Sequence, residues 1–286
     1  MDQGELALSD RDFERIKARV YRVAGIALSD SKRSLVVSRL FRLVRGLGFT
    51  SFAAYLDHLD EPGSQSDAQN FVNALTTNLT RFFREDHHFE HLNRYVGSLL
   101  TSQRQRATDG RPRLRIWSAG CSTGQEPFTI AMSLLAAFPD LRRWDFRILA
   151  TDIDTAVLGK AALGVYPESE LAGLSPVRAA LFERGADGTI RIPQAARELV
   201  SFLPLNLIDG WPMHGPFDAV FCRNVTIYFD KRTQGEVFER FYQLLTPGGF
   251  LYIGHSENIG AAASGFRLVG KTIYQARAAQ KARDAA

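Results

Sequence analysis

Several glycine and polar residues follow short apolar runs, and their types suit a nucleoside ligand. Gly120 and Gly124 lie in the loop after LRIWSA, and Asp152 ends the run WDFRILATD. A glycine loop lets a ligand approach the backbone, and a carboxylate can accept hydrogen bonds from both ribose hydroxyls. The fingerprint G-x-G-x-x-G would need glycines where Ser122 and Gln125 stand, which disfavours an NAD site. The pattern permits S-adenosylmethionine, although a glycine after a strand is more often plain turn chemistry.

These residues can meet only if the apolar runs form one sheet. Strands are expected at 114–120, 144–154, 200–206, 217–224 and 248–256, with helices at 127–138 and 231–245 between them. This alternation predicts a mostly parallel sheet with helices on both faces. Ligands of such sheets bind at the carboxyl ends of the strands, where Asp152, Asn206, Arg223 and Asn224 are expected.

The first hundred residues have a different pattern. Apolar residues recur at helical spacing from Ser9 to about Tyr95, which predicts four or five short helices with N-caps at Ser9 and at Thr50 or Ser51. We predict a helical N-terminal domain at 1–97, a linker at 98–113, an α/β domain at 114–276 with a small antiparallel insertion at about 164–200, and a frayed tail at 277–286.

Composition excludes several classes of protein. The 286 residues are 45% apolar, and 35 basic against 31 acidic residues leave a net charge of +4. This charge favours acidic partners without the excess of a nucleic-acid packaging protein. The chain shows no basic-then-apolar signal segment and no apolar window of membrane-spanning length, so we expect a cytoplasmic protein that does not insert into membranes.

Metal binding is not expected. The two cysteines, Cys121 and Cys222, lie inside apolar runs rather than in a Cys-x-x-Cys pattern. His87 and His91 share a helical face beside His88, but no further histidine and carboxylate set completes a site. We interpret these three histidines as surface or interface residues.

Five motifs occur in order along the chain: TNLTRFFRE, SAGCSTGQEP, ATDID, FCRNVTIYF and GHSEN. Together they resemble the CheR-type chemoreceptor methyltransferases, which esterify glutamates of bacterial chemotaxis receptors. The resemblance implies an α/β fold in which an all-helical N-terminal domain precedes a doubly wound, Rossmann-like methyltransferase domain with an inserted antiparallel β-subdomain. It also implies S-adenosylmethionine as cofactor, S-adenosylhomocysteine as product and the cytoplasmic domains of chemoreceptors as partners.

The family pattern implies a set of site residues. The cofactor contacts would be Asn78, Thr80, Arg84, Glu126, Asp152, Asn206, Leu207, Arg223 and Asn224. Glu126 would face the positive end of the cofactor. A glutamate acceptor is already ionised near pH 7, so no general base is needed and catalysis rests on alignment. Arg84 would hold the acceptor carboxylate and Tyr228 would orient it.

Each of these residues also has a structural interpretation. Asp152 and Asp154 could cap a helix, and capping is favoured for Asp154. Asn78 and Thr80 could form a turn. Arg84 could cover neighbouring rings, and Tyr228 could be an aromatic plug in the core.

Two further expectations concern the acceptor. Arg39, Arg42 and Arg45 recur every three residues and would form a basic stripe on one helix, with Leu40, Val44 and Leu47 turned away. Such a stripe would contact glutamate-rich receptor helices, the alternative being a solvated face. The short loop 184–189 contains a tight-turn pair, Asp187-Gly188, so we expect no docking of a receptor C-terminal pentapeptide, although an edge strand could still accept one.

Two other functions stay open. One is a methyltransferase acting on nucleic acid or small molecules, and the other is an adenosyl-binding signalling module without methyl transfer. A nucleic-acid amino methyltransferase would carry Asn or Asp, two prolines and an aromatic residue after the fourth strand. The residues at 223–226 are Arg-Asn-Val-Thr, which argues against a nucleic-acid partner.

Overall fold

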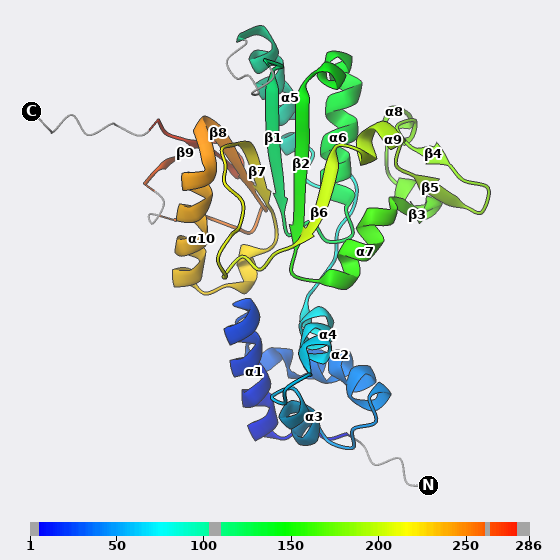
Figure 1. Cartoon of the computed structure of the whole chain (residues 1–286), viewed down its shortest axis with the longest axis vertical. Helices are drawn as coiled ribbons and strands as arrows, with labels where there is room; N and C mark the ends of the chain where they lie inside the picture. Colours follow the sequence, from blue (N-terminus) through cyan, green and yellow to red (C-terminus); the bar gives the residue numbers. More distant parts are fainter. Residues whose placement is uncertain (1–5, 103–109, 261–263, 279–286) are drawn as a thin grey trace, which may run out of the picture.

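The chain folds into a helical lobe and an α/β lobe, seen one below the other in Figure 1. The computed structural model describes residues 6–102, 110–260 and 264–278. The helical lobe consists of α1 (Asp10–Ala24), α2 (Arg33–Gly46), α3 (Phe52–His58) and α4 (Gln65–Leu75), with a 3-10 turn η1 (Asp30–Lys32). Ser9 and Ser51 accept hydrogen bonds from Asp12 N and Ala54 N, so both expected N-caps are confirmed.

The next helix, α5 (His87–Ser102), belongs to the other lobe. Its buried residues Phe89, Leu92 and Val96 pack into the core beside the sheet rather than against α1 to α4. The chain therefore passes from the first core to the second between Leu75 and Phe82, and the predicted domain boundary after residue 97 is wrong. The helix also continues past residue 98, where the linker was expected. Residues 103–109 of that predicted linker lie outside the described residues, as does the tail from 279 onward.

The α/β lobe is built on a seven-stranded sheet with the order β6-β2-β1-β7-β8-β10-β9. Its strands are β1 (Arg113–Ala119), β2 (Asp145–Asp152), β6 (Val200–Pro204), β7 (Phe217–Cys222), β8 (Leu245–Ile253), β9 (Phe266–Gly270) and β10 (Ile273–Ala276). The first five are parallel, as predicted, whereas β10 pairs antiparallel with both β8 and β9. The sequence analysis missed β9 and β10.

Helices cover both faces of this sheet (Figure 1). On one face Ile116 packs with α5 and α6 (Gln125–Ala137), and on the other face its neighbour Trp117 packs with α10 (Lys231–Leu244). Successive strand residues point to opposite faces, so a central strand covered on both faces is expected to be apolar over most of its length. This explains the continuous apolar runs in the sequence, and the doubly wound fold is confirmed.

A small insertion follows α7 (Thr155–Leu163). Three strands, β3 (Val165–Pro167), β4 (Glu183–Arg184) and β5 (Thr189–Arg191), form an antiparallel sheet in the order β3-β5-β4. The short elements η3 (Glu168–Leu171), α8 (Pro176–Ala179) and α9 (Gln194–Arg197) complete it, on the right of Figure 1. Gly188 has a φ of +68° in the β4–β5 turn, which explains why the predicted tight turn forms there. We call this insertion the β-subdomain.

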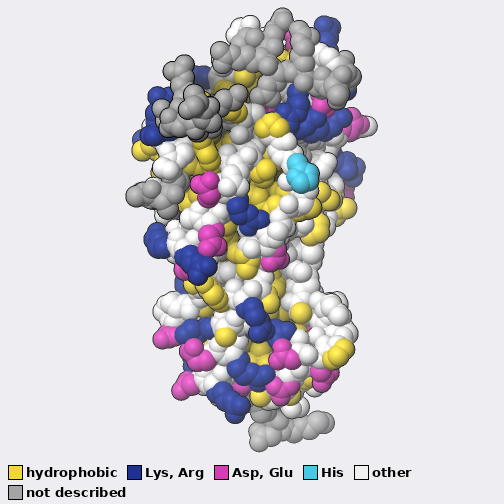
Figure 2. All heavy atoms as spheres, turned by 60° about the vertical axis from the view of Figure 1, so that its left-hand side comes forward, with side chains coloured by type: hydrophobic (Ala, Val, Ile, Leu, Met, Phe, Trp, Pro, Cys, Tyr) yellow, Lys and Arg dark blue, Asp and Glu magenta, His cyan; other side chains and the backbone are white. Residues whose placement is uncertain are grey.

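The surface carries mixed charge. In Figure 2, basic and acidic side chains are intermixed on both lobes of the face in view. In the described part of the chain, the helices are all too short or too polar to cross a bilayer.

Candidate active site

A pocket lies between the helical lobe and the carboxyl ends of the parallel strands. The end of α1, the segment 75–84, the glycine loop after β1 and the residues that follow β2, β6 and β7 line it. The lining includes every residue predicted for cofactor binding or catalysis, namely Asn78, Thr80, Arg84, Glu126, Asp152, Asn206, Leu207, Arg223, Asn224 and Tyr228. The arginines predicted for receptor contact are not among the lining residues.

The glycine loop forms one wall. Gly120 has a φ of +83°, and a Cβ atom at this position would collide with the side chain of Val225. Only glycine therefore lets the loop lie this close to the residues after β7. The amides of Gly120 and Cys121 donate to Thr151 O at 2.8 and 2.9 Å, which ties the loop to the end of β2.

Asp152 is buried at the end of β2 and lines the pocket. Its two carboxylate oxygens accept hydrogen bonds from the amides of Ser122 at 2.7 Å and Asp154 at 2.9 Å. Burial raises the pKa of Asp152, although these two bonds favour the carboxylate. Each oxygen keeps a lone pair that is free of these bonds, so the carboxylate can still accept from a ligand.

Asp154 has the capping role that the sequence favoured. Its Oδ1 accepts from the amides of Ala156 and Val157 at the start of α7, at 2.9 and 3.3 Å. Its Oδ2 accepts from Thr76 Oγ1 at 2.8 Å and from Asn78 Nδ2 at 2.7 Å. Asp154 thus also anchors the segment that carries Asn78 to the end of the sheet.

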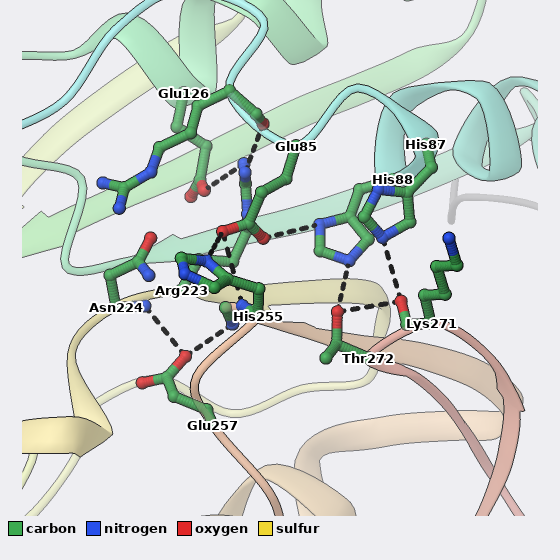
Figure 3. Close-up of polar contacts among 12 residues, drawn as sticks. Glu85, His87, His88, Glu126, Arg223, Asn224, His255, Glu257, Lys271 and Thr272 are labelled. Carbon is green, nitrogen blue, oxygen red and sulfur yellow. Dashed lines mark hydrogen bonds and ion pairs between the residues drawn. The ribbon is translucent and has the colours of Figure 1, made fainter.

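Arg223 is at the centre of a buried ionic cluster beside the pocket (Figure 3). Its Nη1 donates to Glu126 Oε2 at 3.1 Å, and its Nε donates to Glu85 Oε2 at 3.4 Å. A further hydrogen bond runs from Nη2 to Arg84 O. Burial raises the pKa of Glu126 even though Arg223 and a 2.6 Å hydrogen bond from Ser118 oppose the shift. Arg223 therefore holds both the glutamate of α6 and the backbone carbonyl of Arg84.

Glu85 continues this cluster toward the surface, and Figure 3 shows it between Arg223, His255 and His88. His255 Nδ1 lies 3.0 Å from Glu85 Oε1. Burial would raise the pKa of Glu85, but Arg223 and the hydrogen bond from His255 hold it below its usual value. Sequence reasoning missed Glu85, although the residue lies within the quoted motif TNLTRFFRE.

One of the three histidines in the first turns of α5 is not a surface residue. His88 is fully buried, with Nε2 at 3.0 Å from Thr272 Oγ1, and burial lowers its pKa to about 3. His91 is half-buried, with Nδ1 at 3.0 Å from Tyr252 Oη. The surface prediction is wrong for His88 because α5 turns this face toward the sheet.

Glu257 fixes the loop that carries Asn224. Asn224 has a φ of +61°, and its amide donates to Glu257 Oε2 at 2.8 Å. The other oxygen, Oε1, accepts from the amides of Val225 at 3.0 Å and Thr226 at 2.8 Å. The motif GHSEN was quoted in the sequence analysis, but no role was predicted there for its buried glutamate.

Arg84 and Tyr228 lie on the pocket wall with partly exposed side chains. Arg84 donates from Nη1 to Leu79 O at 2.9 Å. Tyr228, in the 3-10 turn η4 (Thr226–Tyr228), packs against the core of the helical lobe. Within the described residues its hydroxyl has no hydrogen-bond partner. Tyr228 therefore packs against the helical lobe and also lines the pocket.

Asn206 joins the two lobes. Its Nδ2 donates to Val23 O of α1 at 2.8 Å and to Asp209 Oδ2 at 2.9 Å. The side-chain amide is thus engaged within the protein, although the residue lines the pocket. Its position in the pocket agrees with the prediction, while its donor groups bind the helical lobe.

The predicted stripe of three arginines on α2 is wrong for Arg39. Arg39 donates to Leu75 O at 2.8 Å, to Thr76 O at 2.7 Å and to Thr77 Oγ1 at 3.0 Å. Its guanidinium therefore caps the C-terminus of α4, and the side chain is only partly exposed. Arg42 and Arg45 are exposed.

The apolar side of α2 also departs from the prediction at one residue. Leu40 and Val44 are buried as expected, but Leu47 is 42% exposed because it follows the end of the helix.

Comparison with known proteins agrees with the two-lobed division. A family model described as CheR methyltransferase, all-alpha domain, matches residues 11–76, and one described as CheR methyltransferase, SAM binding domain, matches residues 78–275. The chain is 45% identical to "Chemotaxis protein methyltransferase" of Escherichia coli (strain K12), covering 94% of this chain and 92% of that protein. It is 47% identical to "Chemotaxis protein methyltransferase 2" of Pseudomonas aeruginosa, with 94% of each covered.

Proposed function

The chain belongs to the CheR methyltransferase family, and we propose that it transfers the methyl group of S-adenosylmethionine to glutamate carboxylates of bacterial chemoreceptors. The activity is S-adenosylmethionine-dependent methylation in chemotaxis. The observation that supports the glutamate acceptor most is the wall formed by Arg84 and Tyr228 in the same pocket as Asp152 and Glu126. This wall offers a cation and a hydroxyl.

The residues present suit the cofactor. Gly120 lines the pocket and lets its loop lie against Val225, and the buried Asp152 retains acceptor capacity for the two ribose hydroxyls. Glu126 would accept from the amino group of the methionyl part, and Arg223 would keep that carboxylate in place. Bound S-adenosylmethionine supplies a methyl group that is electrophilic because it is attached to a sulfonium sulfur.

The acceptor needs alignment rather than activation. A glutamate has a reference pKa of about 4.3, so its carboxylate is ionised near pH 7. Arg84 would bind one carboxylate oxygen, and the hydroxyl of Tyr228 would orient the group so that the other oxygen faces the methyl carbon. The oxygen forms the new bond to carbon, and the electron pair of the broken bond stays on sulfur. No proton moves in this step, so the site residues contribute by positioning.

The receptor contact would use α2. Arg42 and Arg45 remain exposed on this helix and would attract glutamate-rich receptor helices, with an association that weakens as salt rises. We further propose that the protein does not need a receptor C-terminal pentapeptide, because the β4–β5 connection at 185–188 is a tight turn. A calorimetric titration with such a pentapeptide should show no binding heat, and saturable binding at micromolar concentration would contradict this.

The acceptor class is tested with methyl-labelled S-adenosylmethionine. The purified protein is incubated separately with a chemoreceptor cytoplasmic fragment, with DNA and with RNA. We expect label in the receptor fragment alone. Label in nucleic acid would favour the nucleic-acid alternative, and cofactor binding without transfer to any acceptor in a cell extract would favour an adenosyl-binding signalling module.

A further inference from the structure

The β-subdomain contacts two of the segments that line the pocket, the glycine loop after β1 and the segment 75–84. Tyr166 of β3 donates from Oη to Thr123 O, in the glycine loop, at 2.7 Å. Phe82, in the segment that carries Arg84, lies with its ring centroid 5.0 Å from that of Tyr166 and 4.8 Å from that of Phe182. The subdomain is therefore packed against the pocket walls and is not a free appendage.

The segment next to Arg84 has an unusual backbone. Phe83 and Glu85 have φ values of +57° and +56°, and left-handed conformations are uncommon for residues with side chains. Such a turn persists only where its surroundings hold it. Because Arg84 lies between these two residues, whatever holds the turn also sets the direction of the Arg84 side chain.

Besides the contacts that Glu85 makes with His255 and His88, contacts from three elements hold this turn. Thr129 Oγ1 of α6 accepts from Phe83 N at 3.3 Å, and Arg223 after β7 donates to Arg84 O. The third contact comes from α8 of the β-subdomain. Arg178 Nη2 donates to Asp86 Oδ2 at 2.5 Å, and its guanidinium carbon lies 4.5 Å from the ring centroid of Phe83.

We propose that Arg178 is a positioning residue for methyl transfer, through which the β-subdomain aims Arg84 at the acceptor. The inference rests on the proposed function, because it gives Arg84 the acceptor carboxylate as its partner. Arg178 itself is not among the residues that line the pocket. Its planar guanidinium clamps the turn at two points, by an ion pair to Asp86 and by stacking on Phe83. Lysine could supply the charge without the stacking.

The test compares Arg178→Ala with a matched control in the same subdomain. Arg184 Nη1 pairs with Glu168 Oε1 at 2.9 Å on the exposed side of the β-subdomain, so Arg184→Ala removes an ion pair without touching the turn. We expect Arg178→Ala to lower kcat for receptor methylation by about tenfold, which is the scale of one exposed ion pair plus one cation–π contact. Arg178→Lys should recover part of the loss, and Arg184→Ala should match the unmodified protein.

Two readouts separate positioning from loss of structure. Affinity for S-adenosylhomocysteine should change by less than about twofold in Arg178→Ala, because the pocket walls that face the cofactor keep their own contacts. In a double-mutant cycle, the protein with both Asp86→Ala and Arg178→Ala should lose no more kcat than the single variant with the larger loss. Unchanged kcat in Arg178→Ala would overturn the proposal, as would an equal loss of kcat and cofactor affinity.

Amide hydrogen exchange keeps this test independent of the proposed function. Exchange at residues 83–86 should be faster in Arg178→Ala than in the unmodified protein and in Arg184→Ala. If the unmodified protein methylates no receptor, the proposed function fails, while the exchange data still decide whether Arg178 holds the turn. Unchanged exchange would overturn the inference even if receptor methylation is observed.

Discussion

Arg223 and Glu126 form an ion pair at 3.1 Å in which the two side chains are only 3% and 12% exposed. Arg223 comes from the loop after β7, and Glu126 comes from the first turn of α6. The pair therefore joins two elements that meet at the carboxyl edge of the sheet. A buried ion pair loses much of its Coulomb energy to desolvation, so its main effect is to hold Glu126 in a fixed position at the pocket wall.

Asp152→Ala should weaken binding of S-adenosylmethionine and S-adenosylhomocysteine by about one to two decades, since a hydrogen bond to a charged group contributes roughly 1.5–3 kcal/mol. Isothermal titration calorimetry measures the affinity. Asp140→Ala, which removes an exposed carboxylate of η2 (Pro139–Arg143), serves as the control and should bind normally. A folded Asp152→Ala protein with unchanged affinity would exclude Asp152 from the cofactor site.

Tyr228→Phe should lower kcat for receptor methylation by about tenfold, the size of one hydrogen bond of roughly 1–1.5 kcal/mol made in the transition state. The ring is retained, so packing against the helical lobe and the melting temperature should not change. Steady-state kinetics at saturating receptor measure the effect. Full activity would leave Tyr228 with a packing role alone.

Replacing Arg42 and Arg45 together by Ser should reduce the rate of receptor methylation at low salt, with little effect at high salt, because exposed charges act through long-range attraction. Cofactor affinity should stay the same.

Arg39→Ser tests whether Arg39 caps the C-terminus of α4. It should lower the melting temperature, because the carbonyl groups at the end of α4 lose their donor. If all three residues behave alike, the distinction between them is wrong.

His88 should make folding stability depend on pH. Its pKa is about 3 in the folded protein against 6.5 for a free histidine, so the unfolded chain binds more protons between these values. The free energy of unfolding therefore falls as pH drops below 6.5, with a contribution of up to about 1.4 kcal/mol per pH unit. Urea unfolding between pH 5 and 7 should show a shallower slope for His88→Gln. Equal slopes would mean that His88 titrates normally in the folded state.

The parallel strands could be predicted because a strand buried on both faces is apolar over most of its length. The residues that follow these strands then had to meet at one edge, which is why Asp152 and Arg223 were found from sequence. Helical periodicity shows that α5 has a buried face but not which core receives it, so the boundary at residue 97 was wrong. The prediction that Arg39 belongs to an exposed basic stripe was wrong for a related reason. Spacing along α2 does not reveal that the end of α4 lies beside this residue.

The contacts of Glu85 and Glu257 could not be predicted at all. Glu85 meets His255 across 170 positions of sequence, and Glu257 binds amides 31 to 33 positions away. Nothing in the local pattern of either residue distinguishes it from an exposed glutamate. Only the folded chain brings these partners together.

The chemical nature of the product tests the central claim most directly. Receptor fragment methylated with labelled S-adenosylmethionine is treated with mild base, and the volatile label that is released is measured. A glutamate methyl ester hydrolyses under these conditions and gives labelled methanol, whereas an N-methyl group is stable. We predict release of nearly all the label, and an almost complete loss of labelling with Arg84→Ala. Label that stays on the receptor after base treatment would contradict the proposed glutamate O-methylation.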